Sequence, residues 1–137
     1  FAEDFRSACD IVAVPLAMPG PGEIRVRNRF CGVNGIFDTQ IARNAVDYVP
    51  VKPPSFTGVE AIGIVDAVGP EVSDFAVGDA AVTVRFTGGY REANVGPASG
   101  FARAPSASRE WLALASTGVS ALLALDHVGA VRDGEPV

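Results

Sequence analysis

Glycine and proline recur along this chain too often for a helical bundle, and their spacing restricts the fold more than any other feature. The 137 residues contain 15 glycines and 10 prolines. Proline lacks the backbone N–H that a helix interior or a central strand requires, and glycine is frequent where a chain turns. Many short strands joined by tight turns fit this spacing. We therefore expect one mainly β domain, with helices confined to its C-terminal part.

The clearest strand pattern covers residues 23–30. Apolar or uncharged side chains alternate with Arg25, Arg27 and Arg29, as they do in a strand with one buried face. The buried face would carry Ile24, Val26, Asn28 and Phe30. The arginine face is either simply solvated or a phosphate-binding surface, and the pattern leaves both interpretations open.

Further strands are predicted over residues 11–14, 61–68, 79–86, 90–95 and 101–104. The strand over 61–68 contains Gly63, and a glycine inside a strand is typical of tightly curved sheets. The pair Gly88-Gly89 predicts a hairpin turn that joins 79–86 to 90–95. Residues 36–43 are expected to form one or two helical turns.

The pattern changes after Pro105. Ser106 or Ser108 can cap a helix that holds Glu110 and Trp111 in its first turn. Apolar residues at helical spacing then predict a second helix from about residue 117 to 127. We therefore expect a compact β domain that passes into helices.

Charge and composition exclude several classes of partner. The net charge is −5 and the pI is about 4.7, so nucleic acid is not expected to bind. No apolar run approaches the ~20 residues that span a membrane, and no signal peptide is visible, so we expect a cytoplasmic protein with a small-molecule substrate. Cys9 and Cys31 form no CxxC pair and are either free thiols or a disulfide. The chain begins at Phe1 and ends just after a turn, which predicts a piece of something longer.

Five segments, in order, resemble the quinone oxidoreductase branch of the medium-chain dehydrogenases/reductases. Residues 26–30 and 51–54 resemble the prostaglandin reductase-3-like subgroup in particular. The five segments are PGEIRVRNRFCGVN at 21–34, GVEAIGIVDAVG at 58–69, FAVGDAA at 75–81, GYREA at 89–93, and residues 116–134.

The resemblance implies a fold and a division of the chain. Residues 1–115 would form a GroES-like, partly open β-barrel that binds substrate, and residues 116–137 a helical link toward a dinucleotide-binding domain. The chain itself contains no Gly-rich strand–turn–helix motif of a Rossmann unit.

Zinc is not expected in this chain. The zinc-dependent alcohol dehydrogenases of the superfamily have a cysteine and a histidine where this sequence has Asn34 and Val59. A catalytic zinc needs three protein ligands, usually His, Cys or carboxylate, and the sole histidine, His127, lies far along the chain. The resemblance therefore implies the zinc-independent branch.

The chemistry that the resemblance implies is NADPH-dependent reduction of an activated C=C bond, in an enone or an enoyl thioester, or of a quinone. Negative charge develops on the carbonyl oxygen as hydride arrives at the β-carbon, so a hydrogen-bond donor aimed at that oxygen lowers the barrier. A tyrosine or a water then supplies the proton.

The resemblance assigns catalytic roles to Asn34 and Tyr48, and contacts with the nicotinamide to Asn34, Thr117 and Ser120. Each role has a structural alternative, because Asn-Gly is a common turn and hydroxyl side chains cap or pack helices. Tyr90 is predicted to be a strand residue that packs on the barrel. Glu60 is predicted to be structural, with an arginine as its partner.

Two functions of different classes remain open. The chain is either the substrate-binding half of an NAD(P)H-dependent oxidoreductase, or a stand-alone GroES-like domain that acts as a binding module or a cofactor-free isomerase or cyclase. In either case the apolar residues of the last helix predict a homo-oligomer or pairing with a second chain.

Overall fold

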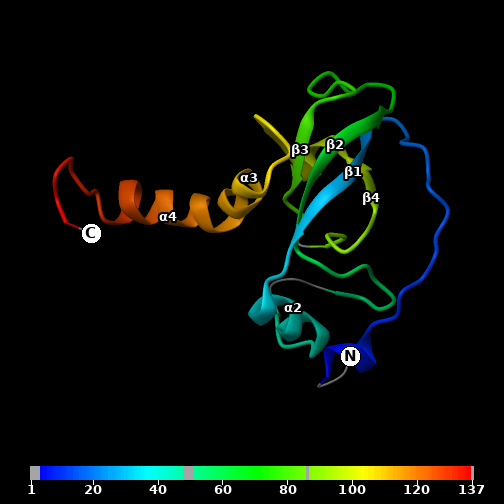
Figure 1. The fold of residues 1–137 in the computed structure, drawn as a ribbon, viewed down its shortest axis with the longest axis horizontal. Coiled ribbons are helices and arrows are strands. Elements are labelled where there is room, and N and C mark those ends of the chain that lie inside the picture. Colours follow the sequence, from blue (N-terminus) through cyan, green and yellow to red (C-terminus); the bar gives the residue numbers. More distant parts are fainter. Residues whose placement is uncertain (1–3, 48–50, 86, 137) are drawn as a thin grey trace.

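The computed structural model describes residues 4–47, 51–85 and 87–136. A curved antiparallel sheet forms the body of the molecule, and the C-terminal helix projects away from it (Figure 1). The strand order is β4-β1-β2-β3-β5, and every neighbouring pair is antiparallel. The strands are β1 (Glu23–Gly32), β2 (Glu60–Val68), β3 (Ala80–Thr83), β4 (Ala93–Pro97) and β5 (Phe101–Ala104).

The sheet curls until its two edge strands approach each other. The edge strands β4 and β5 are consecutive in the chain and are joined by η1 (Ala98–Gly100), a single 3₁₀ turn. In a flat five-stranded sheet the outer strands would lie about 19 Å apart, whereas this link reaches about 14 Å at full extension. The connection therefore requires a partly open barrel, and the predicted GroES-like, mainly β fold with C-terminal helices is confirmed.

Two apolar clusters hold this barrel together. The first lies inside the barrel, and the second lies where the first turns of the C-terminal helix cover β2 and β3. The inner cluster contains Ile24, Val26, Val65, Phe75, Ala81 and Phe101, and the outer cluster contains Ile62, Val82 and Leu112.

Helices flank the barrel at both ends of the chain. Near the N-terminus are α1 (Phe5–Ala8) and α2 (Gly35–Ala42). One continuous helix then runs from Arg109 to Val128, capped by the Ser108 hydroxyl, which accepts from the Trp111 N–H. It is divided into α3 (Arg109–Ala113), η2 (Leu114–Gly118), α4 (Val119–Leu123) and η3 (Ala124–Val128), and the two η segments are π-helical. The predicted division of the chain at 115/116 stays a prediction.

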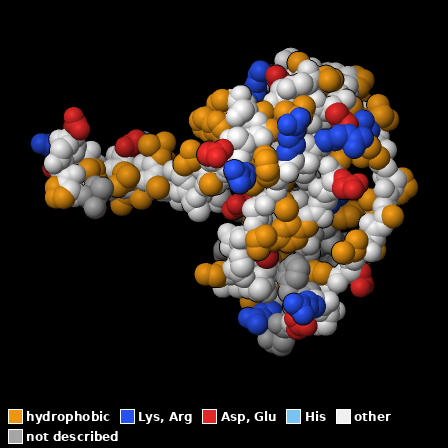
Figure 2. Space-filling model, viewed as in Figure 1, with side chains coloured by type: hydrophobic (Ala, Val, Ile, Leu, Met, Phe, Trp, Pro, Cys, Tyr) orange, Lys and Arg blue, Asp and Glu red, His pale blue; other side chains and the backbone are white. Residues whose placement is uncertain are grey.

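Most of the C-terminal helix is exposed. Apolar side chains cover much of the projecting part (Figure 2), among them Leu114, Val119, Leu122, Leu123 and Val128. The helix is 20 residues long and contains an 18-residue window with a mean hydropathy of 1.4, which meets the length and composition of a membrane span, although one such helix is weak evidence for a span. The sequence predicted two helices here, one capped by Ser106 or Ser108 and one over about 117–127, whereas the structure joins them into a single helix from Arg109 to Val128.

The predicted first strand, residues 11–14, is wrong. The segment belongs to no strand, and Ile11 is fully exposed. Pro15 and Pro19 follow this segment and lack the backbone N–H that donates hydrogen bonds to a neighbouring strand. An extended segment here therefore cannot form a regular hydrogen-bonded strand pair.

The predicted hairpin at Gly88-Gly89 is also wrong. β3 pairs with β2 and β5, whereas β4 pairs with β1 at the other edge of the sheet. Gly89 is needed for close packing, because its N–H donates to the Gly58 carbonyl at 2.7 Å and a Cβ on Gly89 would lie 2.7 Å from the Glu60 carbonyl oxygen.

The arginine face of β1 is held by one carboxylate. Asp66 on β2 accepts from Arg25 Nε at 2.6 Å and from Arg27 Nε at 2.7 Å. These ion pairs involve two of the three arginines of this face. Cys9 and Cys31 are free thiols.

Asp66→Asn should lower the free energy of unfolding by about 1 kcal/mol at pH 7. The hydrogen bond from Arg25 holds the pKa of Asp66 below its usual value of about 3.9. A depressed folded-state pKa adds stability above the unfolded pKa, and this stability is lost as the pH falls through the folded pKa. Urea unfolding of both proteins should therefore show a difference that shrinks below pH 4. A difference in unfolding free energy that stays constant down to the lowest pH at which both proteins fold would contradict the ion pairs. The matched control is Asp133→Asn, because Asp133 is exposed.

Candidate functional site

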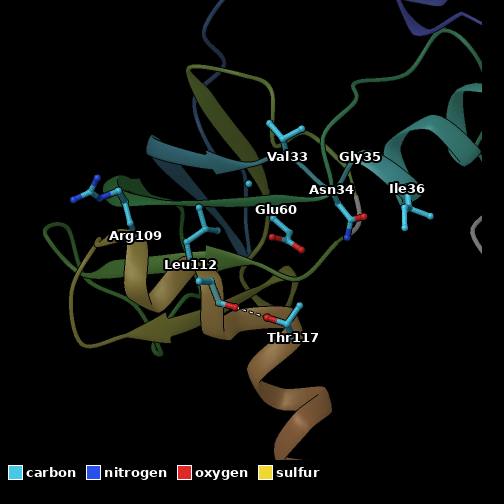
Figure 3. Close-up of a pocket in the computed structure, with 10 residues that line it drawn as sticks. Val33, Asn34, Gly35, Ile36, Glu60, Arg109, Leu112 and Thr117 are labelled. Atoms are coloured by element: carbon cyan, nitrogen blue, oxygen red, sulfur yellow. Dashed lines mark hydrogen bonds between the residues drawn. The ribbon is translucent and has the colours of Figure 1, made fainter.

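An open cleft of about 570 Å³ lies where the start of the C-terminal helix meets the end of β1 (Figure 3). Its walls come from three parts of the chain: the loop between β1 and α2, the first residue of β2, and the first turns of α3 and η2. The lining residues are Gly32, Val33, Asn34, Gly35, Ile36, Glu60, Arg109, Leu112, Ala113 and Thr117.

Strand pairing brings the polar residues of the cleft together. Gly32, the last residue of β1, pairs with Glu60, the first residue of β2. The loop that leaves β1 therefore carries Asn34 to the same end of the sheet. A Cβ on Gly32 would lie 2.5 Å from Glu60 Oε2, so a glycine at this position makes room for the carboxylate.

Asn34 caps α2 and still offers a hydrogen-bond donor to the cleft. Its Oδ1 accepts from the Phe37 N–H at 3.0 Å, which satisfies one of the unpaired N–H groups at the start of the helix. Among the residues that the structure describes, Nδ2 has no hydrogen-bond partner. The sequence left Asn34 as either a functional residue or a turn residue, whereas here it is a helix cap that lines the cleft.

Glu60 is the charged group at the centre of the cleft. Its carboxylate lies between Asn34 and Leu112 in Figure 3. In the described ranges it accepts no hydrogen bond and forms no ion pair, so the predicted arginine partner is absent there. Glu60 therefore gives the cleft an acceptor opposite the Asn34 donor.

Tyr90 is placed differently from the prediction. It precedes β4, and its hydroxyl donates to Asp38 Oδ2 at 2.5 Å. Burial and this hydrogen bond raise the pKa of Tyr90 well above its usual value, so the hydroxyl remains protonated and a donor. Sequence reasoning missed Asp38, which is buried on α2; the available signal was an acid four residues after a capping Asn, which resembles a capping box.

Of the other predicted site residues, one lines the cleft, one lies outside it and one is not described by the structure. Thr117 lines the cleft, and its hydroxyl donates to the Ala113 carbonyl at 2.6 Å, so its oxygen can still accept. Ser120 lies on α4, outside the cleft lining, and its hydroxyl donates to the Ser116 carbonyl. Tyr48 lies outside the described residues.

The donor set of the cleft does not fit a metal ion. Across residues 4–47, 51–85 and 87–136, no three His, Cys, Asp or Glu side chains gather as ligands. The cleft offers instead an amide N–H, a carboxylate, a hydroxyl and the Arg109 guanidinium beside the apolar Val33, Ile36 and Leu112. This arrangement can bind one small planar molecule and donate a hydrogen bond to its carbonyl oxygen.

The comparisons with known proteins agree with this fold. Residues 20–115 match the alcohol dehydrogenase GroES-like domain. Prostaglandin reductase-3 of Mus musculus is 38% identical over 125 residues, which are 90% of this chain and 32% of that protein. 2-Haloacrylate reductase of Burkholderia sp is 36% identical over 93 residues, 67% of this chain and 28% of that protein.

A solved structure extends the likeness to three dimensions. Escherichia coli quinone oxidoreductase, in complex with NADPH, superposes with a TM-score of 0.69 at 33% identity, over 85% of this chain and 35% of that one. The chain thus spans about a third of the length of the relatives that it matches.

Proposed function

Because the chain belongs to the alcohol dehydrogenase GroES-like domain family, in its zinc-independent quinone oxidoreductase branch, we propose that it is the substrate-binding and catalytic part of an NADPH-dependent oxidoreductase. Its substrates are small molecules with an activated C=C bond, such as enones or enoyl thioesters, or quinones. These substrates follow from relatives named as reductases of prostaglandins, haloacrylate and quinones. The cytoplasmic location stays a prediction.

The single observation that supports this chemistry is the unpartnered Nδ2 of Asn34 at the cleft. A substrate carbonyl placed there accepts its hydrogen bond, and the bond strengthens as negative charge builds on the oxygen. The backbone of Asn34 is already fixed by the helix cap, so little reorganisation is needed when the charge develops. Val33, Ile36 and Leu112 offer a contact surface to the apolar part of the substrate.

NADPH supplies the hydride when it is bound. Only the nicotinamide end would meet this chain, where the Asn34 amide and the Thr117 hydroxyl offer polar contacts. Ser120 lies outside the cleft lining, so it would contact a part of the cofactor that extends out of the cleft. The Glu60 carboxylate faces the same space and can accept a hydrogen bond from a carboxamide or hydroxyl.

An NMR titration of the 137-residue chain with cyclohexenone tests the proposal. The Asn34 side-chain amide signals should shift with saturation, and cyclohexene, which lacks the carbonyl, should leave them unmoved. Equal shifts with both ligands, or no saturable shift with cyclohexenone, would contradict a carbonyl site at Asn34.

We also propose that the exposed helix associates with a second copy of the chain or with a second chain. Leu114, Leu122 and Leu125 recur at helical spacing and are 52%, 57% and 40% exposed. Light scattering should show a mass above that of the monomer at high concentration, and Leu122→Glu should restore the monomer. Ser120→Glu is the matched control, because about 100° per residue places it on the opposite side of the helix from Leu122. A wild-type chain that is monomeric at all concentrations would contradict the proposal.

A further inference from the structure

Asp38 and Tyr90 connect the cleft to the barrel without lining the cleft. Asp38 is 5% exposed on α2, and Tyr90 lies in the segment before β4, 52 residues further along the chain. Neither side chain is among the residues of the cleft wall. A carboxylate this deeply buried carries a desolvation cost, and its hydrogen bonds must offset that cost.

The hydrogen bonds of Asp38 converge on Asn34. Asp38 Oδ2 accepts from the Asn34 backbone N–H at 3.1 Å and from the Tyr90 hydroxyl at 2.5 Å. Asn34 in turn accepts from the Phe37 N–H through Oδ1. Both the backbone and the side-chain oxygen of Asn34 are thereby fixed, which leaves Nδ2 a single direction toward the cleft.

Tyr90 is itself anchored in the barrel. Its N–H donates to the Thr57 carbonyl at 3.1 Å, and the Gly89 N–H donates to the Gly58 carbonyl at 2.7 Å. Asn28 on β1 adds a hydrogen bond from Nδ2 to the Arg91 carbonyl at 2.9 Å. The chain of contacts therefore runs from the barrel through Tyr90 and Asp38 to Asn34.

We propose that Asp38 and Tyr90 are positioning residues that aim the Asn34 amide at the substrate carbonyl. The inference rests on the proposed role of Asn34 and deepens it. Tyr90 acts as a donor to Asp38 and does not touch the substrate. Asp38 holds the first turn of α2 against the barrel. The position of Asn34 Nδ2 in the cleft wall is therefore set by the fold.

Tyr90→Phe is the sharpest test, because it removes one hydroxyl and keeps the ring. In the 137-residue chain we expect cyclohexenone to bind about tenfold more weakly, the effect of one misplaced hydrogen bond. Without ligand, the Asn34 side-chain amide signals should move and the Phe37 amide proton should exchange faster with solvent. Asp38→Ala should change the same signals more, and Asp38→Asn, which can still accept, should change them less.

Thr39→Ala is the matched control on the same helix, since among the described residues the Thr39 hydroxyl donates to the Gly35 and Ile36 carbonyls of its own turn. It should leave both the ligand affinity and the Asn34 signals unchanged. The proposal is overturned if Tyr90→Phe, with its fold intact, keeps the wild-type Asn34 signals and Phe37 exchange. These two readouts need no ligand, so they decide the positioning role even if the wild-type chain fails to bind an enone.

Discussion

Gly63→Ala should lower the free energy of unfolding by about 3 kcal/mol or more, enough to unfold a marginally stable domain. Gly63 lies in the middle of β2, opposite Asn28 of β1. A Cβ there would come 1.9 Å from the Arg27 carbonyl oxygen and 2.8 Å from the Asn28 Cα. These are backbone atoms, so no side-chain rotation relieves the clash, and β1 must move away from β2. Chemical unfolding monitored by circular dichroism measures the loss.

Gly35→Ala is the matched control for this substitution. Gly35 is the first residue of α2, and apart from its chain neighbours and the backbone of its own helix, no atom of the described residues lies within 4 Å of a Cβ placed on it. Alanine is the better helix former, so this variant should be as stable as the wild type or slightly more stable. A Gly63→Ala variant within about 1 kcal/mol of the wild type would show that the two strands do not approach as closely as described.

Asn34→Asp should abolish most activity while it preserves the fold. Aspartate caps helices as well as asparagine does, so the bond from the Phe37 N–H survives, whereas the Nδ2 donor is lost. Loss of one preorganised donor to a developing oxyanion costs about 10²–10³ in kcat. The assay uses a chimera in which this chain replaces the matching third of E. coli quinone oxidoreductase, whose structure holds NADPH.

Asn34→Ala separates the two roles of this residue. It should lose the same activity and, in addition, about 1 kcal/mol of stability with the helix cap. If Asn34→Asp in a folded chimera retained kcat within about threefold of the wild type, Asn34 would cap the helix but would not stabilise the developing oxyanion.

The strands with one clear periodicity were predictable from the sequence. The alternation over 23–30 and the apolar run around Gly63 correspond to β1 and β2, because a buried face demands apolar residues at every second position. Phe30 was predicted on the buried face of β1 but is exposed, since the register shifts between Asn28 and Phe30. The edge strand at 101–104 and a helix cap at Ser106 or Ser108 were also predictable, since Pro105 and a serine just before the helix are local signals, and the structure selects Ser108.

Long-range pairing was not predictable in the same way. The Gly88-Gly89 pair has the composition of a hairpin turn, but Gly89 packs against Gly58 and Glu60, a contact that only the tertiary fold reveals. Residues 11–14 have strand-like composition and no strand partner, because pairing depends on which edge is free rather than on propensity.

The candidate site was predicted in part. The family resemblance pointed to Asn34 and Thr117, which the fold brings to one cleft. Asp38 and Tyr90 meet across 52 residues, a contact that no local spacing encodes. The carboxylate of Glu60 could be assigned to the cleft only after the pairing of Gly32 with Glu60 was known.

Transfer of deuteride from labelled NADPH to cyclohexenone by the chimera tests the proposed function most directly. The GroES-like part of that protein is this chain, so any reduction takes place against its cleft. Deuterium should appear at the β-carbon of the product, with the rate dependent on Asn34. A folded chimera that binds NADPH but leaves the enone and quinones unreduced would contradict a reductase and favour a domain that binds its ligand without nicotinamide chemistry.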